Sequence, residues 1–181
     1  MKKINIVVGE KGSGKSTFLE IINTFGFYTT ELSVQWKYLK VLGFERNEKE
    51  GEWDVVVISL VYDNLLRDLD CFPIFISGFS RLSEIDFLKN RGFETRIIKL
   101  NSSLKERYKR IKDRRRIGEE EMTLEEFHEK DLRRLGSIEG YKTNNFGSLL
   151  ALSEYSIDNY NGVDSLVFKV KKMLIDFNYL K

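Results

Sequence analysis

The sequence predicts a single α/β domain in which helices cover both faces of a largely parallel sheet. Its 181 residues are 41% hydrophobic and 32% charged, which is an ordinary composition for one globular domain with its own core. Short apolar runs alternate with helical patterns along the chain, as in successive βαβ units. The first apolar run leads into a glycine- and lysine-rich turn and then into a helical pattern. No internal repeat or low-complexity linker suggests a second domain, so we expect one domain over residues 1–181.

The first half of the chain alternates strands with helices and then becomes ambiguous. Ile4–Val8 is a short continuous apolar run, typical of a buried strand, and Ser16–Thr24 follows as a helix. Phe25–Thr30 is a weaker strand candidate, and Val34–Leu42 has a helical pattern. The four consecutive β-branched residues near the start of Asp54–Leu69 favour a strand, whereas the length of the segment and its later leucines favour a helix. We predict a helix there.

The second half predicts three strands and four helices. The expected strands are Pro73–Ser77, Thr95–Leu100 and Tyr155–Asp158. The expected helices are Leu82–Asn90, Ser103–Arg116, Thr123–Leu135 and Val163–Phe177. The helix from Thr123 opens with Thr-Leu-Glu-Glu, a capping-box pattern. Apolar residues recur at helical spacing in the last helix.

Residues 9–16 carry the most specific motif of the sequence. They read Gly-Glu-Lys-Gly-Ser-Gly-Lys-Ser and fit G-x-x-x-x-G-K-[ST] at every fixed position. The glycines let the backbone turn so that its N–H groups surround phosphate oxygens, and the following helix directs its N-terminal dipole at the same anion. Lys15 can bridge the terminal phosphates, and the Ser16 hydroxyl can ligate Mg²⁺.

The context of the motif supports this interpretation, because a strand precedes it and a helix follows it. We therefore expect the chain to bind a nucleoside triphosphate, with ATP and Mg²⁺ as cofactors and Ser16 as the metal ligand. The expected cofactor-binding residues of this segment are Gly9, Glu10, Lys11, Gly12, Ser13, Gly14, Lys15, Ser16 and Thr17.

Composition and charge restrict the remaining possibilities. The formal net charge is only +2, so nucleic acid is an unlikely partner unless a local patch binds it. No apolar run approaches the roughly 20 residues of a membrane helix, and Ile4–Val8 is too short for a signal sequence. We expect a cytoplasmic protein without membrane contact, as a monomer or homodimer. Cys71 is the only cysteine and is expected in the core.

Further stretches carry a resemblance to a known family. Residues 76–89 (ISGFSRLSEIDFLK) look like a strand followed by Asp-Gly-x-Arg-x-x-x-Glu and a helix. Residues 107–116 and 123–136 are similar to a cationic helix and a small lid, and residues 157–159 to a last strand with an Asn-containing turn. With the motif above, they resemble the small P-loop nucleotide kinases related to dephospho-CoA kinase and adenylate kinase, especially their uncharacterised archaeal-type branch.

This resemblance implies a five-stranded parallel sheet of order 2-3-1-4-5, with a small helical lid at about residues 114–123. It also implies phosphoryl transfer from ATP to a small nucleotide-like acceptor, such as a nucleoside monophosphate or dephospho-CoA. Two positions depart from the family pattern. Ser77 stands where the family usually carries Asp, and Ser80 stands at the usual Arg position, with Arg81 one place later.

Several residues become candidates for the reaction. Arg107, Arg110 and Arg114 share one helix face by their spacing, and arginine donors suit spread phosphate charge; we expect Arg110 and Arg114 to be catalytic together with Lys15. Glu31 follows the second strand candidate and is a candidate base and acceptor-binding residue. The alternatives are a solvated basic face paired with the acidic residues that follow it, and an exposed acid at a helix start.

The end of the third strand contributes candidates for acceptor binding. Gly78 and Arg81 lie at the carboxyl edge of the sheet, where α/β proteins bind ligands. Glu84 could replace the missing carboxylate, but it could equally be a first-turn acid of a helix. Asn159 is expected near the donor base, with a turn residue as the alternative.

The sequence thus favours an ATP-dependent small-molecule kinase and leaves two alternatives. Ser77 in place of a carboxylate favours a nucleotide-binding module with degenerate catalysis. The eight basic residues between Lys105 and Arg116 favour a polynucleotide-directed kinase or NTPase, although the acidic run that follows them argues against a net basic footprint.

Overall fold

The computed structural model of the protein describes residues 2–41, 58, 59, 61, 63, 66, 69–115, 121–136 and 146–181. Within these residues five strands form one sheet in the order β2-β3-β1-β4-β5, and every neighbouring pair is parallel. The strands are β1 (Lys3–Val8), β2 (Tyr28–Glu31), β3 (Ile74–Ser77), β4 (Glu94–Asn101) and β5 (Tyr155–Asp158). This topology confirms the expected fold class and strand order.

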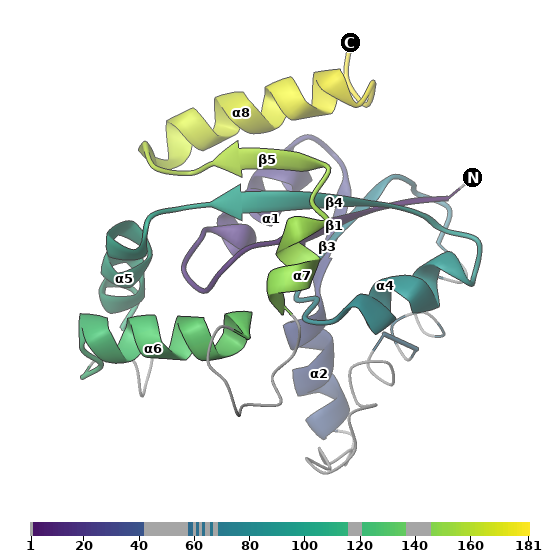
Figure 1. Ribbon diagram of the computed structural model, residues 1–181. Helices are drawn as coiled ribbons and strands as arrows, with labels where there is room; N and C mark the ends of the chain where they lie inside the picture. Colours follow the sequence, from purple (N-terminus) through teal and green to yellow (C-terminus); the bar gives the residue numbers. More distant parts are fainter. Residues whose placement is uncertain are drawn as a thin grey trace.

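Helices cover both faces of the sheet (Figure 1). One layer consists of α1 (Lys15–Thr24) and α8 (Gly162–Asp176), and the other of α2 (Leu32–Val41), α4 (Leu82–Lys89) and α7 (Phe146–Ala151). Two helices, α5 (Leu104–Asp113) and α6 (Leu124–Leu135), lie beyond the carboxyl end of β4, at one end of the molecule. None of the helices in the described ranges combines the length and the apolarity needed to cross a membrane.

The position of β1 at the centre of the sheet explains why its sequence is mostly apolar. Ile4, Ile6 and Val8 belong to the apolar cluster beneath α2, α4 and α7, whereas Val7 belongs to the cluster formed with α1 and α8. Successive side chains of a strand point to opposite faces, and both faces here are covered. Asn5 is the buried polar exception, and its Nδ2 donates to the Ile74 carbonyl at 3.4 Å. The loop that follows the strand therefore starts from a buried base.

The α5–α6 pair has a small apolar cluster of its own, separate from the two clusters on the sheet. Its residues are Ile111, Met122 and Phe127, with Leu104 and Tyr108 packed against them. The predicted capping box at the start of α6 is confirmed: Thr123 Oγ1 accepts from the Glu126 amide at 3.1 Å, and the Glu126 carboxylate accepts from the Thr123 amide at 2.8 Å. This pair is thus a satellite unit anchored next to the sheet edge.

Two element boundaries differ by three residues from the sequence prediction, and one helix was not predicted. The second strand begins at Tyr28 and not at Phe25, because Phe25 ends α1 and Gly26 follows with a left-handed φ of 86°. The helix predicted to Arg116 ends at Asp113, shortly before Arg115 with its φ of 46°. The six-residue helix α7 was not predicted at all, since it is too short to show a helical period.

Two further predictions concern the residues that precede the third strand. Most of the segment predicted as a helix over Asp54–Leu69 lies outside the described residues, but Ile58, Ser59 and Val61 are helical, and Ile58 and Val61 are buried in the core. Cys71 is exposed, so its predicted place in the core is wrong. It lies in the connection that precedes β3, between the exposed Asp70 and Phe72, which packs against the core.

The C-terminal helix offers a matched pair for testing the core. Leu174 is fully buried, whereas Ile175, the next residue, is 42% exposed. We expect Leu174→Ala to lower the free energy of unfolding by about 2–5 kcal/mol through lost burial and a residual cavity. Ile175→Ala should cost less than about 1 kcal/mol. Urea denaturation of both variants measures the difference, and equal costs would contradict the packing of α8.

Candidate functional site: the loop between β1 and α1

The glycine-rich loop lies at the centre of the sheet's carboxyl edge. It joins β1, which pairs with β3 on one side and β4 on the other, to the first turn of α1. Open parallel sheets bind ligands at this edge. The first amides of a helix have no partner within the helix, so they are available to an anion. The fold therefore places the motif where a phosphate site is expected.

Two glycines allow the loop to pack at backbone distance against neighbouring elements. A β-carbon on Gly12 would lie 2.7 Å from the carbonyl oxygen of Arg107 on α5, and one on Gly14 would lie 2.4 Å from Nδ2 of Asn159. Both glycines also have left-handed φ angles, of 82° and 98°. A side chain at either position would be strained; on Gly12 it would push the α5 backbone away, and on Gly14 it would displace the Asn159 side chain.

The loop contains a buried polar atom that is suited to an anionic ligand. Ser13 is fully buried, and within the described residues its Oγ has no hydrogen-bond partner. A buried hydroxyl without a partner costs free energy, and a bound oxyanion would supply one. The glycine backbone, this hydroxyl and the N-terminus of α1 therefore fit a phosphate group.

Lys15 is folded back over the loop. Its Nζ donates to the carbonyl oxygens of Gly9, at 2.8 Å, and Glu10, at 3.0 Å. Burial lowers the pKa of Lys15 from 10.5 to about 8, and the charge of Arg134 adds to this effect; Glu31 opposes it. A lysine in this state gains from a nearby polyanion, which would stabilise its charged form.

Ser16 and Glu31 line one hollow between α1 and β2, with a volume of about 440 Å³. Ser16 is exposed at the start of α1, and Glu31 is the last residue of β2. The Glu31 carboxylate accepts a hydrogen bond from Ser33 Oγ at 3.2 Å. The structure thus brings together the predicted Mg²⁺ ligand and the predicted base, and the two oxygens could serve a cation and a hydroxyl in the same space.

Arg110 and Asn159 hold the other side of the loop. Arg110 Nη2 donates to the Asn159 carbonyl at 2.8 Å, and its Nη1 donates to Ser102 Oγ at 3.1 Å and to the Gly12 carbonyl at 3.4 Å. Asn159 Nδ2 donates to the Ser13 carbonyl at 2.8 Å. Both residues therefore touch the loop. The contact of Asn159 with a donor base stays a prediction.

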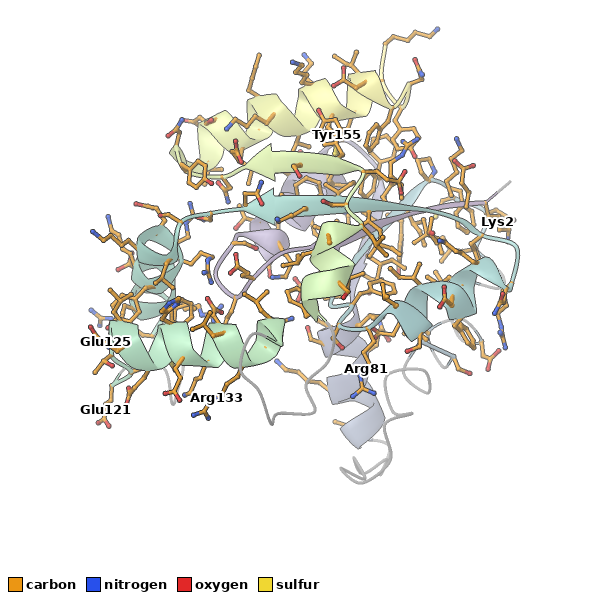
Figure 2. All side chains as sticks on the ribbon, in the orientation of Figure 1. Lys2, Arg81, Glu121, Glu125, Arg133 and Tyr155 are labelled. Atoms are coloured by element: carbon orange, nitrogen blue, oxygen red, sulfur yellow. The ribbon has the colours of Figure 1, made fainter. Side chains whose placement is uncertain are left out.

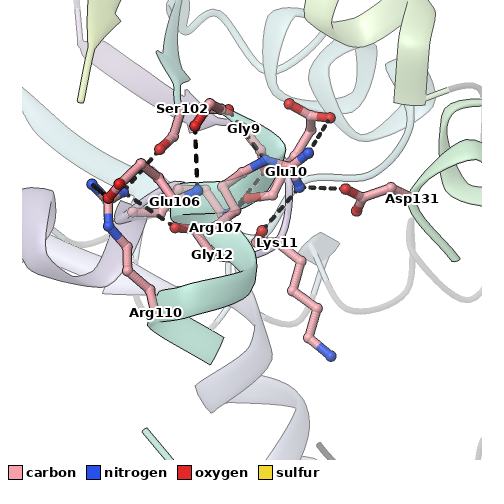
Figure 3. Close-up of polar contacts among 11 residues, drawn as sticks. Gly9, Glu10, Lys11, Gly12, Ser102, Glu106, Arg107, Arg110 and Asp131 are labelled. Carbon is pink, nitrogen blue, oxygen red and sulfur yellow. Dashed lines mark hydrogen bonds and ion pairs between the residues drawn. The ribbon is translucent and has the colours of Figure 1, made fainter. Parts of the chain in front are cut away.

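The three arginines of α5 have different environments. Arg107 is 3% exposed, and its guanidinium pairs with Glu10 of the loop and with Asp131 of α6 (Figure 3). Arg114 is exposed at the end of α5. The lid was expected at 114–123, and residues 116–120 of that segment lie outside the described residues, so the lid and a role of Arg114 within it stay predictions.

The end of β3 lies beside Glu31. Ser77 is 2% exposed and pairs in register with Glu31 on β2. Gly78 follows with a φ of 101°, and a β-carbon there would lie 3.1 Å from the amide nitrogen of Leu32. Arg81 stands just before α4 (Figure 2). Gly78 thus lets β3 end close to the start of α2, while acceptor binding by Gly78 and Arg81 stays a prediction.

Glu84 is a helix cap in this structure. Its side chain is 2% exposed, and Oε2 accepts from the amides of Ser80 at 2.7 Å and Arg81 at 2.8 Å. Of the two sequence interpretations, this geometry favours the first-turn acid, because a carboxylate with two backbone donors is already engaged.

Arg134 is a site residue that the sequence analysis missed. It stands near the end of α6, its guanidinium lies 4.2 Å from the centre of the Phe146 ring, and burial lowers its pKa while Asp131 and Glu10 oppose the shift. Its charge also acts on Lys15. In the sequence it is indistinguishable from its neighbour Arg133, and only the packing of α6 against the loop separates them.

Comparisons with known proteins agree with this fold. The sequence matches no family model and no curated protein. A shikimate kinase from Bacteroides thetaiotaomicron superposes with a TM-score of 0.65 at 12% identity, covering 97% of this chain and 99% of that chain. A gluconokinase from Sinorhizobium meliloti gives 0.56 at 15%, covering 98% and 97%. A tunicamycin resistance protein from Deinococcus radiodurans gives 0.60 at 17%, covering 96% of each chain.

At these identities the likeness shows a shared fold. The chain has the same fold as these three solved structures over almost its entire length.

Substitution of Glu84 separates its two interpretations. Glu84→Ala should lower the free energy of unfolding by about 2–4 kcal/mol, because two buried amides lose their acceptor. Glu84→Gln keeps an acceptor oxygen and should cost less. In calorimetry, Glu84→Gln should leave Mg²⁺-dependent ATP affinity within about threefold of wild type. Loss of the Mg²⁺ dependence would show that the carboxylate serves the metal.

The depressed pKa of Lys15 predicts how ATP affinity depends on pH. Below about pH 8 the free lysine is already charged, so affinity should be level. Above pH 8 binding must recharge it, and affinity should fall by up to about tenfold per pH unit while protons are taken up. Calorimetry between pH 7.5 and 9.5 in buffers of different ionisation enthalpy measures both effects. Lys15→Met should remove this pH-dependence, and an equal slope in that variant would refute the assignment.

Proposed function

We propose that this protein is an ATP- and Mg²⁺-dependent kinase of a small molecule. The observation that carries the proposal is the convergence of cations on a loop built for an anion. Lys15, Arg107 and Arg110 all donate to carbonyl oxygens of the loop, and Ser13 Oγ is buried there without a partner among the described residues. A polyanionic ligand would give the Ser13 hydroxyl a partner and would stabilise the charged form of Lys15. We also propose that the protein is cytoplasmic.

The chain's own residues would divide the work as follows. The amides of residues 9–17 and Lys15 would hold the phosphates, and Ser16 would hold Mg²⁺, which neutralises phosphate charge when bound. Glu31, which lines the same hollow as Ser16, would accept the proton of the acceptor hydroxyl. Arg110, Arg114 and Arg134 are proposed to face the charge that develops on the transferred group.

The acceptor is proposed to be a small hydroxyl-bearing molecule. The family resemblance of the sequence supports a nucleotide-like acceptor, of the nucleoside monophosphate or dephospho-CoA type, with Gly78 and Arg81 in its binding site. Structural neighbours described as a shikimate kinase and a gluconokinase support a wider set of hydroxylated acids. Both sets should be tested together.

One observation favours a second candidate function. Ser77 is buried at the end of β3, where a carboxylate would help to orient the metal shell. A nucleotide-binding module with degenerate catalysis would bind ATP but transfer slowly. A polynucleotide-directed activity has less support, because Arg107 and Arg110 contact the protein itself.

The test is ATP consumption in the presence of nucleoside monophosphates, dephospho-CoA, shikimate and gluconate. Wild type should consume ATP with one of them. Lys15→Ala should lose most of its ATP affinity, and Glu31→Gln should lower turnover by about 10²-fold or more while ATP affinity stays near wild type. ATP binding without turnover for any acceptor would favour the binding module. Absence of ATP binding would end the proposal.

A further inference from the structure

Arg107 is a buried cation that joins three separate elements. Its Nε donates to the Ser102 carbonyl at 3.2 Å, just before α5, and its Nη1 donates to the Lys11 carbonyl at 3.2 Å in the loop. Its Nη2 donates to Glu10 Oε1 at 3.1 Å, and Nη1 also pairs with Asp131 of α6 (Figure 3). Arginine has five donors in a fixed plane, and these contacts engage its whole guanidinium.

The charges explain why this position needs a cation. Glu10 lies in a loop shaped for phosphate, where an uncompensated carboxylate would repel the ligand. Asp131 is 5% exposed on α6 and would be costly to bury alone. The single guanidinium contacts both carboxylates. It therefore compensates the repulsion between Glu10 and a phosphate ligand and also the cost of burying Asp131. It also fixes the distance between the loop and α6, because one rigid group contacts both.

The consequence reaches Arg134 through the geometry of α6. Asp131 and Arg134 are three residues apart, so they share a face of the helix. The opposite side of α6 is directed to solvent: Glu125 and Arg133 point away from the sheet (Figure 2), and Arg133 pairs with Glu129 there. Movement of Asp131 relative to the loop would therefore move Arg134 relative to the loop as well.

We propose that Arg107 and Asp131 are positioning residues that tie α6 to the phosphate-binding loop and thereby hold Arg134 on the face of α6 that is turned toward the loop. The inference rests on the proposed function, since it assigns Arg134 to the terminal phosphate of the donor. It also states that Arg107, although it lies on the predicted basic face of α5, is a structural link and not a phosphate ligand. If Asp131 is tied to the loop in this way, any segment that closes over the site must lie N-terminal to Asp131.

The experiment is a double-mutant cycle between Asp131→Asn and Arg134→Ala, measured as calorimetric affinity for ATP and for ADP with Mg²⁺. Arg134→Ala should weaken ATP binding about tenfold or more, the scale of a charge-assisted contact, and leave ADP binding within about twofold. Asp131→Asn should weaken ATP binding in the same selective way. The double variant should be no weaker than Arg134→Ala alone, within about twofold.

Matched controls separate positioning from general damage. Glu129→Gln removes an exposed carboxylate from the same helix and should leave both affinities unchanged. Arg107→Lys keeps the charge but cannot contact all three elements, and should reproduce the selective ATP defect; it replaces Asp131→Asn in the cycle if that variant does not fold. Additive losses, or equal losses for ATP and ADP, would overturn the proposal.

Hydrogen exchange of the ligand-free protein tests the link without any nucleotide. Asp131→Asn should speed exchange in α6 and in the loop of residues 9–14 together, whereas Glu129→Gln should change neither. If wild type binds no ATP, the proposed function fails, and the exchange result still decides whether the link exists. If ATP binds and the loop exchanges at the wild-type rate in Asp131→Asn, the link fails while the proposed function stands.

Discussion

The close backbone approach of the glycine-rich loop to its neighbours is the constraint on which the rest of the site depends. Gly12 leaves no room for a side chain against Arg107, and Gly14 leaves none against Asn159. Because the loop is pressed between α5 and the end of β5, its carbonyl oxygens become acceptors for Arg107, Arg110 and Asn159.

This constraint also shapes the electrostatics. Placing α5 and α6 close to the loop brings four cationic side chains into a small, partly desolvated space: Lys15, Arg107, Arg110 and Arg134. Two of them are compensated in different ways. Arg107 is neutralised by Glu10 and Asp131, and Arg110 donates to neutral oxygen atoms. Burial lowers the pKa of Lys15, and the charges of Arg134 and Arg107 add to the shift; a phosphate ligand would stabilise the charged lysine.

The fold was predicted well from the sequence because the two patterns that indicate it, apolar runs and the glycine-rich motif, are local. Apolar runs bounded by turns indicated all five strands, and the motif at residues 9–16 indicated the connection from β1 to α1. The errors share a physical cause. The turn at Phe25 and Gly26 separates α1 from β2 and so delayed the strand, the six residues of α7 were too few to show a period, and Cys71 became exposed although Phe72 and Pro73 follow it.

For the site, the sequence by itself determined the chemistry of the loop: Lys15, Ser16 and the glycines were evident because their spacing is fixed within one turn of chain. Only the tertiary structure decided which of the many charged residues join them. Arg107, Arg110 and Arg114 share a helix face in sequence, yet one is buried between two carboxylates, one clasps the loop and one is exposed. Arg134 was missed because its contact with Phe146 and its effect on Lys15 depend on how α6 packs. A charged side chain's role is set by what it faces across the fold, and that information is not contained in local spacing.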